Sequence, residues 1–244
     1  MAKTKCFFRF LNNEDKTIFQ QSRCLFTISV GQQTHENEHF EATIELLNKS
    51  FKSCIMLVDD SLQRHTMAFN RKQNPDYFYE ISIKEGDLWL ERNKKYYENL
   101  QNLEQIIRWD NWLNHPKFNE QKEAIKKLIE KDKDYAYAFE SSVRDFVTKY
   151  HNRISNNEKF NLERAKELSF NFILEECTAL CLWVELNCNY EAYPNLHNAA
   201  INSTREKFVL PTRPDLLNVL TLGFRNAKQL EPQRFLLLEN LMGY

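Results

Sequence analysis

The sequence predicts an α/β protein, with a parallel sheet flanked by helices, in a single domain that spans residues 1–244. Two short apolar runs, at 24–29 and 54–58, flank a helix pattern at 38–52, and such a strand–helix–strand unit implies parallel strands with the helix outside the sheet. A chain of 244 residues can bury a large core without disulfides. No internal repeat and no linker rich in Pro, Gly or Ser divides it, so we expect one domain.

Each element follows from its own pattern. The run at 24–29 has the length of a buried strand and ends before Gly31, the segment at 38–52 repeats apolar residues every three or four positions, and the run at 54–58 is closed by two aspartates. The later elements, in chain order, are a charged helix at 75–103, a strand at 106–109, helices at 118–132 and 134–150, a helix from 162 through the 170s, a strand at 208–210 and a helical end.

The charge and glycine counts exclude several function classes. With 33 basic and 34 acidic residues the net charge is -1, so any surface for nucleic acid must be local. The four glycines, at 31, 86, 223 and 243, are too far apart for a phosphate-binding loop or a dinucleotide fingerprint, both of which need clustered glycines. We therefore expect neither ATP nor a nucleotide cofactor, and we predict no other cofactor.

The sequence also indicates a compartment. It has no apolar run long enough for a signal peptide or a membrane span, so we expect a cytoplasmic protein with no membrane partner. Its six cysteines contain no C-x-x-C pair, and we interpret them as reduced thiols. Cys177, Cys181 and Cys188 could in principle hold a metal, but spacings of four and seven residues favour one face of a buried helix.

The turn after the first strand contains the first candidate site. Ser29 ends that strand, and ligands of open α/β sheets bind beyond the carboxyl ends of the strands. Ser29 is therefore placed where chemistry usually happens. The alternative role for a serine just before a glycine-containing turn is that of a turn or capping hydroxyl.

A second candidate overlaps the first. Residues 35–39 read H-E-x-x-H, the zinc-peptidase pattern in which His35 and His39 would bind zinc and Glu36 would act as the base. The flanking residues are polar, and Ala42 stands where the common extension of the motif has a glycine. We therefore favour a polar turn that leads into a helix, and we predict no metal.

Four segments, taken together, resemble the cyclodipeptide synthases, enzymes that make a cyclic dipeptide from two aminoacyl-tRNAs. They are the strand–helix–strand unit at 25–60, the helix and turn at 134–153, the helix at 162–177 and the Tyr-Pro pair at 193–194. Their order and spacing cover most of the chain between residues 24 and 194. The resemblance implies a Rossmann-like domain, similar to the catalytic domain of class I tyrosyl- and tryptophanyl-tRNA synthetases.

The resemblance also implies catalytic residues. The family's catalytic serine maps onto Ser29, and the glutamate of its Tyr-x-x-x-Glu pair maps onto Glu176, with Phe172 at the tyrosine position. An alternative register would use Cys181 and Glu185, but it leaves only eight residues before the Tyr-Pro pair, so we prefer Glu176.

The remaining site residues define a subfamily and a substrate pocket. Tyr193 and Pro194 match the Tyr-Pro motif of one subfamily, and Gln32 occupies a position that is asparagine in the other. A substrate-contacting asparagine maps onto Asn152. The expected substrate-binding residues are Thr27, Gly31, Gln32, Leu57, Val58, Asn152, Phe172 and Pro194.

The implied reaction runs through a covalent aminoacyl-Ser29 intermediate in a ping-pong sequence. Glu176 would take a proton from the attacking amine, Tyr193 would position the aminoacyl group, and Asn152 would contact the substrate amine. Because the ester arrives already activated on tRNA, no ATP is needed. We expect a monomer that binds tRNA through a basic cluster of Lys84, Arg92, Lys94 and Lys95.

Two alternative functions remain open at this point. Phe172 lacks the hydroxyl of the family tyrosine, so the chain could be a catalytically inactive relative that binds tRNA. The zinc peptidase built on His35, Glu36 and His39 is the other alternative.

Overall fold

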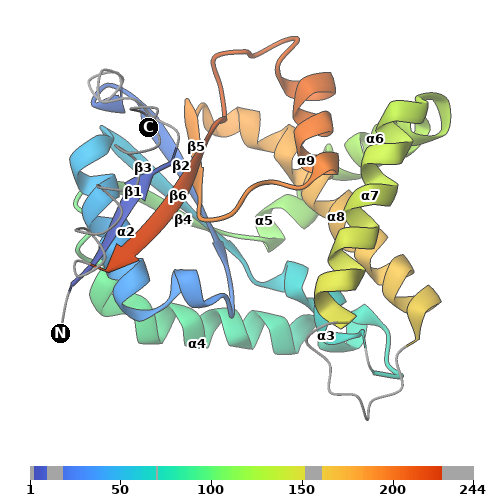
Figure 1. Ribbon diagram of the computed structural model, residues 1–244, viewed down its shortest axis with the longest axis horizontal. Helices are drawn as coiled ribbons and strands as arrows, with labels where there is room; N and C mark the ends of the chain where they lie inside the picture. Colours follow the sequence, from blue (N-terminus) through green and yellow to red (C-terminus); the bar gives the residue numbers. More distant parts are fainter. Residues whose placement is uncertain (1–2, 10–18, 70, 152–160, 227–244) are drawn as a thin grey trace, which may run out of the picture.

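The computed structural model describes residues 3–9, 19–69, 71–151 and 161–226 (Figure 1). In this part of the chain six strands form one sheet in the order β1-β6-β5-β2-β3-β4. All neighbouring strands from β6 to β4 are parallel, and β1 lies antiparallel to β6 at one edge. The strands are β1 (Thr4–Phe8), β2 (Arg23–Ser29), β3 (Ser53–Asp59), β4 (Leu103–Arg108), β5 (Tyr190–Tyr193) and β6 (Asn218–Asn226).

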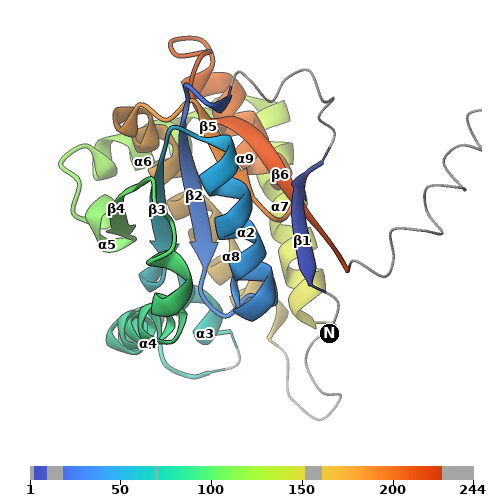
Figure 2. The same cartoon turned by 90° about the vertical axis from the view of Figure 1, so that its left-hand side faces the viewer.

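Helices cover both faces of the sheet. Figure 2 shows α2 in front of β2 and α8 behind it, while α6 and α7 lie beside α8 in Figure 1. The helices are α2 (Asn37–Ser50), α3 (Arg64–Met67), α4 (Tyr79–Tyr97), α5 (Asp110–Leu113), α6 (Phe118–Lys131), α7 (Lys133–His151), α8 (Leu162–Leu182) and α9 (Ala199–Thr204). Short turns of 3-10 helix are η2 (Gln33–His35), η3 (Ser61–Gln63), η4 (Pro75–Phe78) and η5 (Trp183–Leu186), and η6 (Arg205–Val209) is a π-helix.

Because side chains alternate along a strand, the sheet has a separate core on each face. On one face Phe26 and Met56 pack with Phe40 of α2 in what we call the α2-side core. On the other face Leu25 and its neighbours pack with Ile173 of α8 in the α8-side core. The central strands are buried on both faces, which is typical of a parallel sheet and explains their nearly continuous apolar runs.

The first strand–helix–strand unit, the charged helix, the third parallel strand and the three helices from 118 to the 170s are confirmed, with ends shifted by a few residues. The strand predicted at 208–210 is wrong. These residues belong to η6 and the turn after it, where Val209 is fully buried in the α8-side core. A three-residue apolar run carries no periodicity that separates strand from helix.

The end of the chain also differs from the prediction. Instead of a helix, residues 218–226 form β6, whose Leu220 and Leu222 point into the α2-side core. Residues 227–244, which the predicted helical end includes, lie outside the described residues. Strands β1 and β5 were not predicted, because β1 is polar at its start and β5 has only four residues. Within the described ranges, no helix has both the length and the hydropathy to cross a bilayer.

Candidate functional site

The carboxyl ends of β2 and β5 form the switch point of the sheet. The chain runs from β2 through α2 to β3 on one side, whereas β5 pairs with β2 on the other side. In open α/β sheets the crevice at such a point is where ligands bind. Ser29 ends β2 and Tyr193 ends β5, so both residues lie at this crevice.

The two residues are in direct contact. Ser29 Oγ lies 3.1 Å from the Tyr193 hydroxyl, a hydrogen bond in which either oxygen can donate. The side-chain amide of Gln32 donates to the same Tyr193 hydroxyl at 3.1 Å, and its carbonyl oxygen accepts a hydrogen bond from Asn195 at 3.0 Å. Pro194, between Tyr193 and Asn195, is buried. Of the predicted subfamily positions, Gln32 and Tyr193 are therefore brought together at the serine, with Pro194 next to Tyr193 in the chain.

The turn after β2 fixes the serine backbone. Gly31 has a φ of 87°, a left-handed conformation that favours glycine, and the Gln32 amide closes the turn on the Ser29 carbonyl at 3.2 Å. The Ser29 amide donates to Nδ1 of His35 at 2.9 Å. Burial lowers the pKa of His35 to about 4, so its imidazole is neutral, and the same Nδ1 also lies 3.2 Å from the Ser29 carbonyl oxygen.

Helix α8 supplies the predicted carboxylate. Glu176 is half-buried, and burial raises its pKa to about 7, while the charge of His197 lowers that pKa and the charge of Glu191 raises it. Phe172, one turn before Glu176, is buried and packs on Phe146 with ring centroids 5.0 Å apart. A carboxyl group with a pKa near neutrality is suited to act as a base at physiological pH.

Three further polar residues at this crevice were missed by the sequence reasoning. Asp59 ends β3 in register with Ser29, is buried, and has its pKa raised by burial and by the charge of Glu176. Glu191, two residues before Tyr193, is buried and forms an ion pair with His197 at 3.3 Å. The aspartates that close the run at 54–58 were a visible signal for Asp59, whereas nothing in the sequence indicates that Glu191 is buried.

The expected pocket residues of β2 and β3 do not all lie on the same face of the sheet. Thr27 lies in register with Leu57 and on the same side of β2 as Ser29, and both Thr27 and Leu57 are buried. Val58 points to the opposite face, where it packs in the α2-side core. Because neighbouring residues of a strand face opposite sides, Leu57 and Val58 cannot line the same crevice, and we leave Val58 out of the proposed pocket.

The H-E-x-x-H segment is not one helical turn. His35 belongs to η2 and His39 to α2, and Asn37 between them has a left-handed φ of 52°. The Glu36 carboxylate accepts hydrogen bonds from Arg92 and Asn93, at 2.6 and 3.0 Å. The zinc-peptidase alternative is therefore wrong. His35 contacts the Ser29 amide, and Glu36, which would have to act as the base, is held by the Arg92 guanidinium.

Other predicted residues lie away from the serine or outside the described ranges. Asn152 falls among residues 152–160, which the structure does not describe. Glu185, the alternative to Glu176, is paired with His115 and Lys117 at 3.2 and 3.0 Å. The expectation that the three cysteines share one helix face holds for Cys177 and Cys181 of α8 but is wrong for Cys188, which follows η5. Cys177 and Cys188 are fully buried in the α8-side core, as apolar side chains would be.

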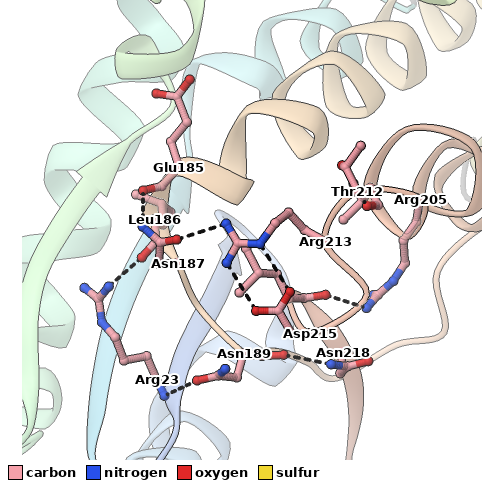
Figure 3. Close-up of polar contacts among 12 residues, drawn as sticks. Arg23, Glu185, Leu186, Asn187, Asn189, Arg205, Thr212, Arg213, Asp215 and Asn218 are labelled. Atoms are coloured by element: carbon pink, nitrogen blue, oxygen red, sulfur yellow. Dashed lines mark hydrogen bonds and ion pairs between the residues drawn. The ribbon is translucent and has the colours of Figure 1, made fainter.

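Figure 3 shows a network of polar contacts that joins segments far apart in the chain. At the amino-terminal edge of the sheet, Arg213 forms an ion pair with Asp215 at 3.2 Å and donates to Asn187, which has a left-handed φ of 52°. Arg23, at the start of β2, donates to the Leu186 carbonyl at 2.6 Å. These contacts tie η5 and the segment before β6 to the sheet, at the edge opposite Ser29.

The predicted tRNA-binding residues all lie on α4 and are exposed. Lys84 and Lys95 are about three helical turns apart and share one side of the helix. Arg92 is paired with Glu36, Lys94 lies 3.5 Å from Glu98, and Lys95 stacks over the Tyr96 ring.

Comparisons with solved structures give strong likenesses over nearly the whole chain. A CDPS (cyclodipeptide synthase) from Fluoribacter dumoffii is 38% identical, with a TM-score of 0.86 over 91% of this chain and 99% of that chain. A cyclodipeptide synthase from Candidatus Glomeribacter gigasporarum bound to Phe-tRNAPhe is 17% identical, with a TM-score of 0.72 over 91% of this chain and 92% of that chain. No protein-family model and no curated protein matches the chain.

A more distant match connects the fold to another enzyme class. A Mycobacterium tuberculosis protein, whose structure relates cyclodipeptide synthetases to type I tRNA synthetases, is 10% identical with a TM-score of 0.59. It covers 93% of this chain and 95% of that chain. The expected Rossmann-like α/β fold, similar to that of class I tRNA synthetases, is thereby confirmed, apart from the antiparallel edge strand β1.

Proposed function

The chain belongs to the cyclodipeptide synthase family, and from this premise we propose that it joins the aminoacyl groups of two aminoacyl-tRNAs into a cyclic dipeptide. The observation that carries the proposal is the contact of Ser29 Oγ with the Tyr193 hydroxyl at the switch point of the sheet. A nucleophile at that place can reach an ester bound beyond the carboxyl ends of the strands.

The first step transfers an aminoacyl group to the protein. Ser29 Oγ attacks the ester carbonyl of the first aminoacyl-tRNA, the bond to the ribose oxygen breaks, and the serine proton goes to that oxygen. One ester replaces another, so the step is nearly neutral in free energy and needs no strong base. Tyr193, hydrogen-bonded to Ser29, orients the hydroxyl and the incoming acyl group.

The second step forms a peptide bond. The α-ammonium of the second aminoacyl-tRNA loses a proton to Glu176, and its amine attacks the acyl-Ser29 carbonyl, which frees the serine and gives dipeptidyl-tRNA. The free amine of that dipeptide then attacks the remaining ester, closes the ring and releases tRNA. Asp59, buried in register with Ser29, is a second carboxyl group, and an ammonium group bound beside it would favour its ionised form.

The proposal also includes a subfamily, an assembly state, a compartment and a substrate pocket. We assign the chain to the Tyr-Pro subfamily on Gln32, Tyr193 and Pro194, and the contact of Gln32 with Tyr193 supports this assignment. Residues 1–244 act as one domain and as a monomer, without ATP, in the cytoplasm where charged tRNA is made. The pocket consists of Thr27, Gly31, Gln32, Leu57, Asn152, Phe172 and Pro194, and the exposed basic residues of α4 contact tRNA phosphates.

The first test is mass spectrometry of the purified protein with a full set of aminoacylated tRNAs. We expect a product whose mass equals two amino acids less two waters, and that mass identifies the amino acids. A protein that binds charged tRNA but yields no such product with any of them would refute the synthase and support the inactive relative, whose motivation is the missing hydroxyl at Phe172.

A second test addresses Glu176. Since the base must be deprotonated and its pKa is about 7, product formation should rise as the pH increases through about 7 and level off above it. Glu176→Gln should lose this rise and slow product formation about 10²-fold, because general-base catalysis typically contributes 10²–10⁴-fold. It should still acylate Ser29, so the aminoacyl-enzyme should accumulate in intact-protein mass spectra.

Glu167→Gln on the exposed side of the same helix is the control and should behave as the unchanged protein. An unchanged pH profile in Glu176→Gln would rule out Glu176 as the base.

A further inference from the structure

His197 lies in the segment between β5 and α9 and contacts both Glu191 and Tyr193. Its Nε2 is 3.3 Å from Oε1 of Glu191, and the two side chains are only 9% and 1% exposed. A buried carboxylate is costly unless a positive or donating group faces it, and His197 is the group that the structure places there.

The same imidazole packs flat on Tyr193. The ring centroids are 5.6 Å apart and the planes are inclined by 12°, a stacked arrangement. Tyr193 in turn holds Ser29 through its hydroxyl. A displacement of His197 would therefore change the position of the phenol and, through it, the position of the serine hydroxyl.

The electrostatic surroundings of His197 come from three elements. Burial lowers its pKa, but the carboxylates of Glu191 on β5 and Glu176 on α8 raise that pKa overall, against the opposing charge of Arg205 on η6. Figure 3 shows Arg205 reaching to the segment before β6, where it donates to the Leu216 carbonyl at 3.3 Å. The charge of His197 lowers the pKa of Glu176, and it acts on that pKa more strongly than the charge of Glu191, which raises it.

We propose that His197 is a positioning residue of this active site. Held by the Glu191 carboxylate, its ring keeps the Tyr193 phenol at Ser29, and the protonated ring favours the carboxylate form of Glu176. The inference rests on the proposed function, since it assigns His197 a part in orienting the nucleophile and in keeping the base ready.

The test separates the ring from the charge. His197→Phe keeps a flat ring against Tyr193 but removes the charge, so the acidic limb of kcat/KM should move to higher pH. At pH 9 the variant should retain most of its activity. His197→Ala loses the ring as well as the charge, so its acidic limb should move in the same way, and at pH 9 its kcat should still be about tenfold lower while KM changes little.

The matched control is His115→Phe. His115 also faces a glutamate, Glu185, at 3.2 Å, but it lies at the opposite edge of the sheet, so the pH profile should not move. An acidic limb that is unchanged in His197→Phe, or full activity in His197→Ala, would overturn the proposal. If His197→Phe does not fold, His197→Gln removes the same charge and takes its place.

A readout without activity tests the pairing itself. In an NMR titration of the histidines, Glu191→Gln should lower the pH at which His197 loses its proton, because the carboxylate that favours its charged form is gone. An unchanged titration would contradict the pairing. If the unaltered protein makes no cyclic dipeptide while His197 titrates as expected, the proposed function fails and the pairing stands.

Discussion

Ser29→Ala should abolish cyclic dipeptide formation, with a fall of at least about 10³-fold, since loss of a nucleophile leaves only the contribution of binding and orientation. The side chain is buried, and Tyr193 is the hydrogen-bond partner of its hydroxyl, so removing one oxygen should leave the fold intact. Intact-protein mass spectrometry after mixing with charged tRNA should show the aminoacyl adduct on the unaltered protein and no adduct on the variant.

The control for this variant is Ser50→Ala. Ser50 ends α2, at the edge of the sheet opposite Ser29, and its loss should change neither the adduct nor the product. An adduct that persists in Ser29→Ala would show that another residue is the nucleophile. A variant without an adduct that still makes product would replace the covalent intermediate by direct attack of one aminoacyl-tRNA on the other.

Glu175→Ala should cause a large loss of stability, about 3–5 kcal/mol at pH 7, because it leaves Arg64, whose side chain is only 11% exposed, without its counter-ion. Glu175 is buried next to the candidate base on α8. Its two carboxylate oxygens accept hydrogen bonds from Arg64 at 2.8 and 2.5 Å, and the Trp109 indole donates at 2.8 Å. This network joins α8 to α3 and to the end of β4, so its loss should lower the midpoint of urea or thermal unfolding.

The effect should depend on pH in a defined direction. Burial alone would raise the pKa of the Glu175 carboxyl. Hydrogen bonds and charge from His65 and Arg64 instead lower that pKa from 4.5 to about 2, which corresponds to about 3 kcal/mol of stabilisation. That stabilisation is complete above about pH 4.5 and is lost as the pH falls towards 2. The difference in unfolding free energy between the two proteins should therefore shrink between pH 5 and pH 3.

Glu163→Ala on the first turn of α8 is the matched control. Its ion pair with Lys166 is largely exposed, and such pairs contribute at most about 1 kcal/mol. Equal losses in the two variants would refute the assignment of the Glu175 network as the main tie between α8 and the sheet.

The parts of the fold that local patterns encode were predictable. The central strands are apolar on both faces and the helices carry long periodic segments, so both give strong signals. The pairing of β1 with β6 joins residues 4–8 to 222–226, and no local pattern encodes a contact over that separation. The run at 208–210 was misassigned because burial, rather than strand geometry, explains its apolar side chains.

The site, like the fold, contains residues that the sequence predicts and residues that it does not. Ser29 was visible from the chain itself, as the polar end of an apolar strand before a glycine turn. Tyr193 and Glu176 came only from the family resemblance, since a lone tyrosine and a glutamate on a charged chain have no local signature. Glu191 and His197 stayed hidden, because a buried carboxylate and its partner six residues later are recognisable only when β5 is packed against β2.

The hydrogen bond from the Ser29 amide to His35 has a consequence for the tetrahedral intermediate. Many serine hydrolases use the amide of the nucleophile itself as one donor of the oxyanion hole. Here that donor is already directed at a buried, neutral imidazole. In the proposed reaction the oxyanion would rely on other donors, and the Tyr193 phenol, 3.1 Å from Ser29 Oγ, is one of them. One fixed amide donor fewer would also give water less help in hydrolysing the proposed aminoacyl-Ser29 ester before the second amine arrives.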